Sequence, residues 1–158
     1  MELLATSPAS IQRAIGILRG GGIVIHATET CYGIACDMTN VQAVERLFAI
    51  KKRPADKPVS ALFGSIDAAK KYLIFSDAAL QLARAHLPGP LTIILPLKPD
   101  ATQIYPVPSR LSPGSVGLRI SSHPTAMAIA EGCARPISTT SANIHGQPET
   151  YSYADILA

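Results

Sequence analysis

Polar side chains that could hold an anion are concentrated in four stretches of this 158-residue chain. The stretches are residues 26–30 (HATET), 51–57 (KKRPADK), 117–124 (GLRISSHP) and 138–146 (STTSANIHG). Lys51, Arg53 and Arg119 carry fixed positive charge, and a guanidinium can bind a phosphate or a carboxylate with two donors at once. Hydroxyl and amide groups supply neutral donors and acceptors beside them. The four stretches therefore predict a cleft that binds an anion and positions it.

Each stretch also has a purely structural explanation. Thr28 and Thr30 could satisfy backbone groups in a turn, and Lys51 with Arg53 could form a solvated helix end. Residues 138–143 could be a turn rich in serine and threonine. Arg119 differs from these, because an arginine inside an apolar strand must find a partner or line a cavity. The hypothesis of an anion site therefore depends on the four stretches occurring together.

Other kinds of site are not supported by the sequence. The four histidines lack metal-ligand spacing with one another, so we predict no resident metal. The GxSxG and GxxxxGK[ST] motifs are absent. The three cysteines include no CxxC pair, which predicts reduced thiols rather than a disulfide framework.

The hydrophobic pattern predicts the elements that position the polar stretches. Apolar residues at helical spacing indicate a helix from Ile11 with Ser10 as its N-cap, and a second from Val41 to about Lys52 with Asn40 as its N-cap. Further helices are predicted at 66–72, 77–86 and 124–131, and strands at 23–26, 59–63, 91–97, 115–120 and 136–141. Because helices alternate with short apolar strands, some of which follow one another directly, we predict an α/β fold with mixed strand pairing.

Composition limits the class of protein. With 47% hydrophobic residues the chain can bury the core of one domain, and its formal net charge of +3 suits an anionic ligand. No apolar run approaches the roughly 18 residues of a membrane span, and the N-terminus lacks the charged region of a signal peptide. We therefore expect a cytoplasmic protein without a membrane segment.

Five motifs in order carry a family resemblance: ATETCYG, IKKRPADKP, LPGPLTIIL, VGLRISSHP and STTSANIHGQP. Together they resemble the YrdC/Sua5 family of threonylcarbamoyl-AMP synthases, from about Ile11 to the end of the chain. The most specific part is the combination of Lys51-x-Arg53 with Ser141-x-Asn143. Any one motif alone would occur by chance in many chains.

The resemblance implies an activity, a fold and partners. Members of the family are nucleotidyltransferases that make L-threonylcarbamoyl-adenylate and pyrophosphate from L-threonine, bicarbonate or CO2, and ATP. This is the first step of the t6A37 modification of tRNA, and a threonylcarbamoyl transferase machinery uses the product. Mg2+ is expected to accompany the triphosphate. The implied fold is a twisted mixed sheet with helices packed on it and a large basic concave cleft.

The resemblance also assigns roles to individual residues. Thr28 and Arg119 would bind L-threonine, Arg119 through the carboxylate. Lys51 and Arg53 match a KxR pair that faces the nucleotide and the carbamate, and they are the candidate catalytic residues. The residues expected to contact ATP are Lys51, Arg53, Ser112, Thr139, Ser141 and Asn143.

Two departures from the family pattern qualify these expectations. Ala27 stands where the family usually has proline, and the chain ends at ETYSYADILA, whereas members usually continue into a segment that helps close the site. We therefore expect residues 1–158 to form a single YrdC-like domain without that segment. Its cleft would be more open, and adenylate formation would be slow or absent.

Two other functions remain open at this point. The same basic concavity could bind double-stranded RNA or tRNA with little or no catalysis, although only 5% of the residues are aromatic and few rings could stack on bases. Alternatively, a carbamoyl-adenylate could be formed and transferred to an acceptor other than threonine.

Overall fold

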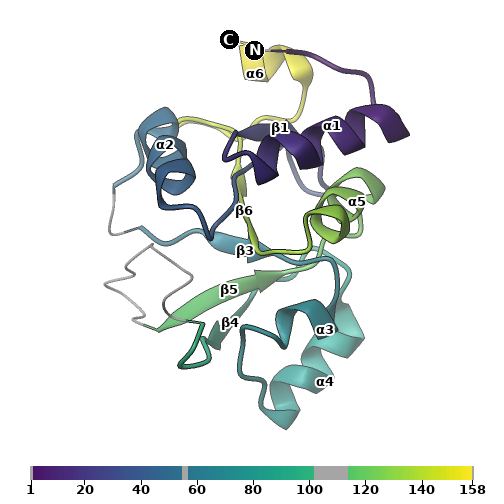
Figure 1. Ribbon diagram of the computed structural model, residues 1–158, viewed down its shortest axis with the longest axis vertical. Coiled ribbons are helices and arrows are strands. Elements are labelled where there is room, and N and C mark those ends of the chain that lie inside the picture. The colour runs from purple at the N-terminus through teal and green to yellow at the C-terminus, as the bar shows by residue number, and fades with distance from the viewer. Residues whose placement is uncertain (1, 55–56, 102–113, 158) are drawn as a thin grey trace.

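Six short strands form one mixed sheet in the computed structural model, which describes residues 2–54, 57–101 and 114–157 (Figure 1). The strand order is β1-β2-β6-β3-β5-β4. Neighbouring strands are antiparallel except β3 and β5, which are parallel. The strands are β1 (Val24–His26), β2 (Gly33–Ala35), β3 (Ser60–Leu62), β4 (Ile93–Pro96), β5 (Ser115–Arg119) and β6 (Ile137–Ser141).

Six helices surround this sheet in the described part of the chain, and side-chain caps fix where most of them begin. Asn40 accepts a hydrogen bond from the Ala43 N–H, and Ser76 accepts one from the Ala79 N–H, which satisfies donors that a helix start leaves free. The helices are α1 (Pro8–Arg19), α2 (Val41–Lys51), α3 (Ile66–Ala69), α4 (Asp77–His86), α5 (Pro124–Cys133) and α6 (Tyr153–Leu157).

The strand register decides which side chains share a face of the sheet. Residues opposite each other on neighbouring strands point to the same side, and successive residues along a strand alternate. Leu62 is opposite Arg119, and Ala61 is opposite Leu118. Arg119 therefore shares its face with Leu62, whereas Leu118 points to the other face.

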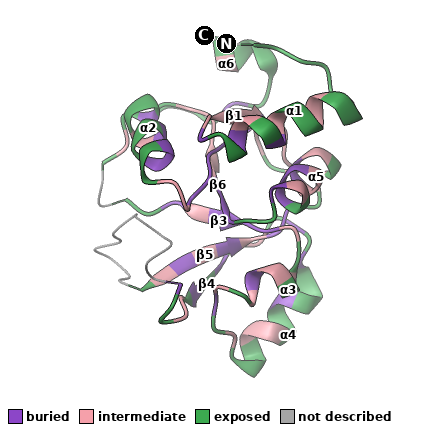
Figure 2. Ribbon diagram, in the orientation of Figure 1, coloured by how far each residue is buried: buried purple, intermediate pink, exposed green. Residues whose placement is uncertain are grey.

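Hydrophobic clusters cover the two faces unequally. On the Leu118 face, α3 and α4 pack on β3, β5 and β4, and α2 packs on β2 through Val44 and Leu47. On the Arg119 face, α1 and α5 cover Leu62 and Ile137 through Leu18 and Ile129, which are fully or almost fully buried. The two helices approach closely because Gly132 has no side chain where the Ile15 side chain packs. Buried residues accordingly line the contacts of these helices with the sheet (Figure 2).

The predicted α/β class and mixed pairing are confirmed, and the predicted position of α4 agrees with the structure. Ser10 as an N-cap is wrong: α1 begins at Pro8 and is capped by Ser7, while Ser10 completes a capping box. The helix predicted over 66–72 is only four residues long. The strand β2 is absent from the sequence prediction. In the structure, the turn after β1 leads directly into β2, which pairs antiparallel with β1 as a hairpin.

Candidate functional site

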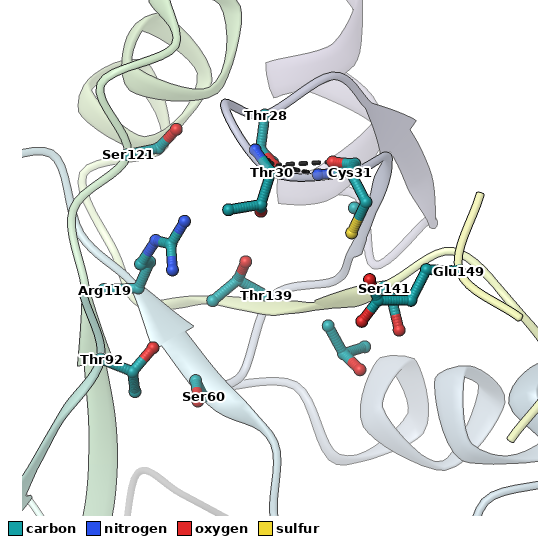
Figure 3. A pocket seen from close by; sticks show the side chains of 12 residues that line it. Thr28, Thr30, Cys31, Ser60, Thr92, Arg119, Ser121, Thr139, Ser141 and Glu149 are labelled. Atoms are coloured by element: carbon teal, nitrogen blue, oxygen red, sulfur yellow. Dashed lines mark hydrogen bonds between the residues drawn. The ribbon is translucent and has the colours of Figure 1, made fainter. Parts of the chain in front are cut away.

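A pocket of about 180 Å³ lies on the Arg119 face of the sheet (Figure 3). Its position follows from the packing, because α1 and α5 cover other parts of this face and leave polar side chains from several strands in the open. The side chains come from β3, β5, β6, the β1–β2 turn and adjoining loops. The lining residues are Thr28, Thr30, Cys31, Gly33, Ser60, Thr92, Arg119, Ser121, Thr139, Thr140, Ser141 and Glu149.

The lining is mainly neutral, and its formal charges are those of Arg119 and Glu149. Hydroxyl groups predominate, so the pocket can donate and accept hydrogen bonds around one fixed cation. Gly117 helps to keep this space open: a Cβ at this position would lie 2.5 Å from Ser60 Oγ and 2.9 Å from Thr92 Cγ2. The geometry suits a small polar ligand that carries an anionic group.

Arg119 is held by an acidic partner. Its Nη2 donates to Glu29 Oε1, and the Ser121 hydroxyl donates to Glu29 Oε2. The side chains of Arg119 and Glu29 are only 13% and 16% exposed. Partial burial by itself raises the pKa of the Glu29 carboxyl, but hydrogen bonds from Ser121 and the backbone, together with Arg119, bring that pKa below its ordinary value.

Thr28 lies at the start of the turn that follows β1. Its hydroxyl donates to the Cys31 carbonyl at 2.6 Å and accepts from the N–H groups of Thr30 and Cys31 at 3.2 and 3.3 Å. Thr28 thus organises the turn and also lines the pocket (Figure 3). Burial raises the pKa of the neighbouring Cys31 thiol, with a further contribution from Glu149, which disfavours the thiolate form that a nucleophile requires.

Lys51 is buried at the end of α2, with 2% of its surface exposed. Its Nζ donates to the carbonyl oxygens of Ser141 and Asn143, the latter at 2.7 Å, and its own carbonyl accepts from the His145 N–H at 2.8 Å. Burial, together with the nearby charge of Arg53, lowers the pKa of Lys51 to about 8. In this structure the ammonium therefore binds the segment that follows β6 and does not line the pocket.

Arg53 binds its own loop. Its Nε donates to the Lys57 carbonyl at 3.1 Å and its Nη2 to the Pro58 carbonyl at 2.7 Å. Burial lowers the pKa of its guanidinium, which nevertheless remains charged at any ordinary pH. Arg53 is not among the side chains that line the described pocket.

The structure brings four of the predicted site residues around one pocket: Thr28, Arg119, Thr139 and Ser141. Asn143 adjoins them, because its Oδ1 accepts from the Ser141 hydroxyl and its Nδ2 donates to the Gln147 carbonyl at 2.6 Å. Ser112 lies outside the described residues. Sequence reasoning missed Glu29, Ser121 and Glu149; the position of Glu29 within HATET was the available signal for the first.

Two further features of the described residues concern metals and membranes. No group of three or more histidine, cysteine, aspartate or glutamate side chains that could hold a metal ion occurs among them. In the same part of the chain, no helix has both the length and the apolar character required to cross a membrane.

The fold and the site together define an α/β protein with a hydroxyl-lined, arginine-containing pocket on the open part of its sheet. The family model Sua5/YciO/YrdC, described as telomere recombination, matches residues 16–158. The chain belongs to this family, as the five sequence motifs predicted.

Individual proteins that are similar to this chain agree with the family assignment. The threonylcarbamoyl-AMP synthase of Marinobacter nauticus is 33% identical over 145 residues, which cover 90% of this chain and 75% of that protein. The synthase of Photobacterium profundum is 29% identical over 150 residues, covering 93% and 79%. The crystal structure of P. abyssi Sua5 complexed with L-threonine superposes with a TM-score of 0.87 at 31% identity, covering 97% of this chain and 44% of that chain. This chain therefore spans less than half of that solved structure.

Proposed function

We propose that this protein synthesises L-threonylcarbamoyl-adenylate from L-threonine, bicarbonate or CO2, and ATP, with release of pyrophosphate. This is the first step of the t6A modification of tRNA. The observation that carries the proposal is the similarity over 97% of the chain to a Sua5 protein solved with L-threonine, combined with a pocket that contains one arginine among hydroxyl groups. Synthases named for this product are similar over 90% of the chain or more.

The reaction requires two anions to meet. The threonine amine forms a bond to the carbon of CO2 and loses a proton, which gives a carbamate; from bicarbonate, the amine proton and a hydroxide from bicarbonate leave together as one water molecule. A carbamate oxygen then bonds to the α-phosphorus of ATP while the bond from that phosphorus to the bridging oxygen breaks and pyrophosphate leaves. The protein's main tasks are therefore to position the reactants and to neutralise their charge.

The pocket offers side chains for each task. Arg119 would bind the threonine carboxylate, and Thr28 at the turn would contact the same substrate. The residues that would contact ATP and the adenylate are Thr139, Ser141 and Asn143. Lys51 would hold the backbone of this segment in place by donating to the Ser141 and Asn143 carbonyls. Arg53, on the neighbouring loop, would reach the nucleotide phosphates only by exchanging its bonds to the loop carbonyls. Mg2+ would enter as part of the Mg·ATP substrate.

Incubation of the purified chain with ATP, bicarbonate and each amino acid in turn tests the proposal. Pyrophosphate release should depend on L-threonine and on bicarbonate, and mass spectrometry should detect threonylcarbamoyl-adenylate. Release that depends on bicarbonate alone would instead indicate a carbamoyl-adenylate made for another acceptor. Binding of tRNA or double-stranded RNA with no release under any of these conditions would contradict the proposed enzyme.

A further inference from the structure

Glu29 binds the pocket arginine but does not itself line the pocket. It lies in the turn between β1 and β2, whereas Arg119 ends β5, 90 residues further along the chain. Arg119 reaches into the pocket and Glu29 is not among the described lining side chains (Figure 3). The carboxylate therefore contacts the guanidinium without being one of the side chains that line the pocket.

The carboxylate is anchored at both oxygens. One oxygen accepts from Arg119 and the other from the Ser121 hydroxyl, whose oxygen in turn accepts from the His123 N–H at 3.1 Å. His123 is the N-cap of α5, so the chain of hydrogen bonds ends on the backbone of a helix start. Glu29 thus connects the β1–β2 turn to the segment between β5 and α5.

This arrangement limits the freedom of the arginine and leaves it able to bind a ligand. A guanidinium has five N–H donors, and the bond to Glu29 occupies one of them. An arginine side chain otherwise has many rotamers, and ordering it at the moment of binding weakens binding. A partner that orders the side chain beforehand removes part of that penalty.

Resting on the proposed function, we propose that Glu29, braced by Ser121, is a positioning residue that holds the Arg119 guanidinium ready for the carboxylate of the amino-acid substrate. Glu29 acts only through Arg119 and touches neither the substrate nor ATP. The ion pair therefore determines how well L-threonine binds and has little influence on ATP.

Kinetics of the full chain test this role. Glu29→Ala should raise the KM for L-threonine by on the order of tenfold, since misplacing a substrate-positioning group weakens both binding and alignment. The KM for ATP should stay unchanged. Ser121→Ala should have a smaller effect in the same direction, and Glu29→Gln, which keeps an oxygen for Arg119 but loses the charge, should be intermediate. Glu45→Ala, which removes an exposed carboxylate on α2, is the matched control.

A double-mutant cycle shows whether Glu29 acts through Arg119. In the Arg119→Ala background, adding Glu29→Ala should leave the KM for L-threonine unchanged. The same cycle applied to the free energy of unfolding, without ligand, should give a coupling between the two residues and also shows whether each variant folds.

Each contrary result has its own meaning. If the wild-type chain does not use L-threonine, the proposed function fails, and the role of Glu29 in it fails as well. If the wild type uses L-threonine but Glu29→Ala leaves its KM unchanged or lowers it, only the positioning role is overturned. Equal increases in both KM values, or absence of coupling in the unfolding cycle, would also overturn it.

Discussion

Lys51, a residue expected to meet phosphate, instead contacts the protein backbone in this structure. Its ammonium donates to two backbone carbonyls of the segment after β6, which it fixes against the end of α2. Sequence analysis predicted the importance of this lysine from a KxR pattern. The geometry indicates that its first effect is on the backbone of residues 141–147.

Replacement of Lys51 should therefore loosen this segment even without ligand. Lys51→Met keeps the aliphatic stem and removes both bonds, so we expect amide hydrogen exchange across residues 143–147 to become faster, on the order of tenfold. Lys52→Met is the matched control, because Lys52 is exposed beside it. Equal exchange rates in the two variants would show that the ammonium does not hold the segment.

Thr28 combines a structural role with a position on the pocket. Thr28→Val keeps the side-chain shape but removes the hydroxyl that organises the turn, so we expect the free energy of unfolding to fall by about 1 kcal/mol. Use of L-threonine should weaken more than ATP binding. Thr28→Ser, which retains the hydroxyl, should restore both properties. A Thr28→Val protein that is as stable as the wild type and depends on L-threonine in the same way would contradict both roles.

At the scale of elements, β5 passes beside the pocket at Gly117, between the lining residues Ser60 on β3 and Thr92 just before β4. In Gly117→Ala the new methyl group would meet Ser60 and Thr92, two lining side chains, and would displace them or fill the space between them. We expect weaker ligand binding and a lower melting temperature, since overpacking typically destabilises a fold by about 1 to 3 kcal/mol.

A second glycine gives the matched control for this change. Nothing lies within 4 Å of a Cβ at Gly16, in the middle of α1. Gly16→Ala should stabilise the protein slightly, because alanine favours a helix by roughly 1 kcal/mol over glycine. Similar melting temperatures for both alanine variants would show that a methyl group at residue 117 fits beside Ser60 and Thr92 without overpacking, which would contradict this prediction.

Elements with local signals could be predicted from the sequence. Residues 77–86 form α4 as expected because cap and hydrophobic period lie within one stretch, and Asn40 caps α2 for the same reason. The strand β2 has only three residues, and its pairing with β6 is specified by residues more than 100 positions away. A local sequence pattern does not predict a strand of this kind.

The sequence predicted which types of residue form the site, but it did not predict which of these residues contact one another. Hydroxyls and cations after strand ends indicated an anion pocket, and four of the named residues line it. The partners of Lys51 and Arg119 lie about 90 residues away, so neither the burial of the lysine nor the Glu29 pair could be read from the sequence. Long-range polar contacts are decided by the fold as a whole.

At the scale of the whole molecule, a buried histidine couples stability to pH. His26 is 4% exposed; its Nε2 has no hydrogen-bond partner among the described residues, and its Nδ1 lies 3.1 Å from the Ala27 carbonyl. Burial lowers the pKa of this imidazole, although the Ala27 carbonyl and the charge of Glu29 act in the opposite direction. The nearby His123 lowers it further.

This lowered pKa predicts a pH window for the loss of stability. An unfolded histidine takes up a proton near pH 6.5, whereas folded His26 resists protonation, so the unfolded state binds more protons below that value. The contribution of His26 to stability is complete above about pH 6.5 and falls as the pH decreases from there. Carboxylates such as Glu29, whose ordinary pKa is 4.5, contribute losses at lower pH.

Urea unfolding at a series of pH values between 8 and 5 measures this dependence. The unfolding midpoint of the wild type should stay level down to about pH 6.5 and then decrease. His26→Phe fills the same buried space with a ring that does not titrate, so its midpoint should decrease less over that interval. His86→Gln, at the exposed end of α4, should follow the wild type. If His26→Phe and the wild type lose stability in parallel, the acid sensitivity arises elsewhere, because only the buried imidazole differs between them.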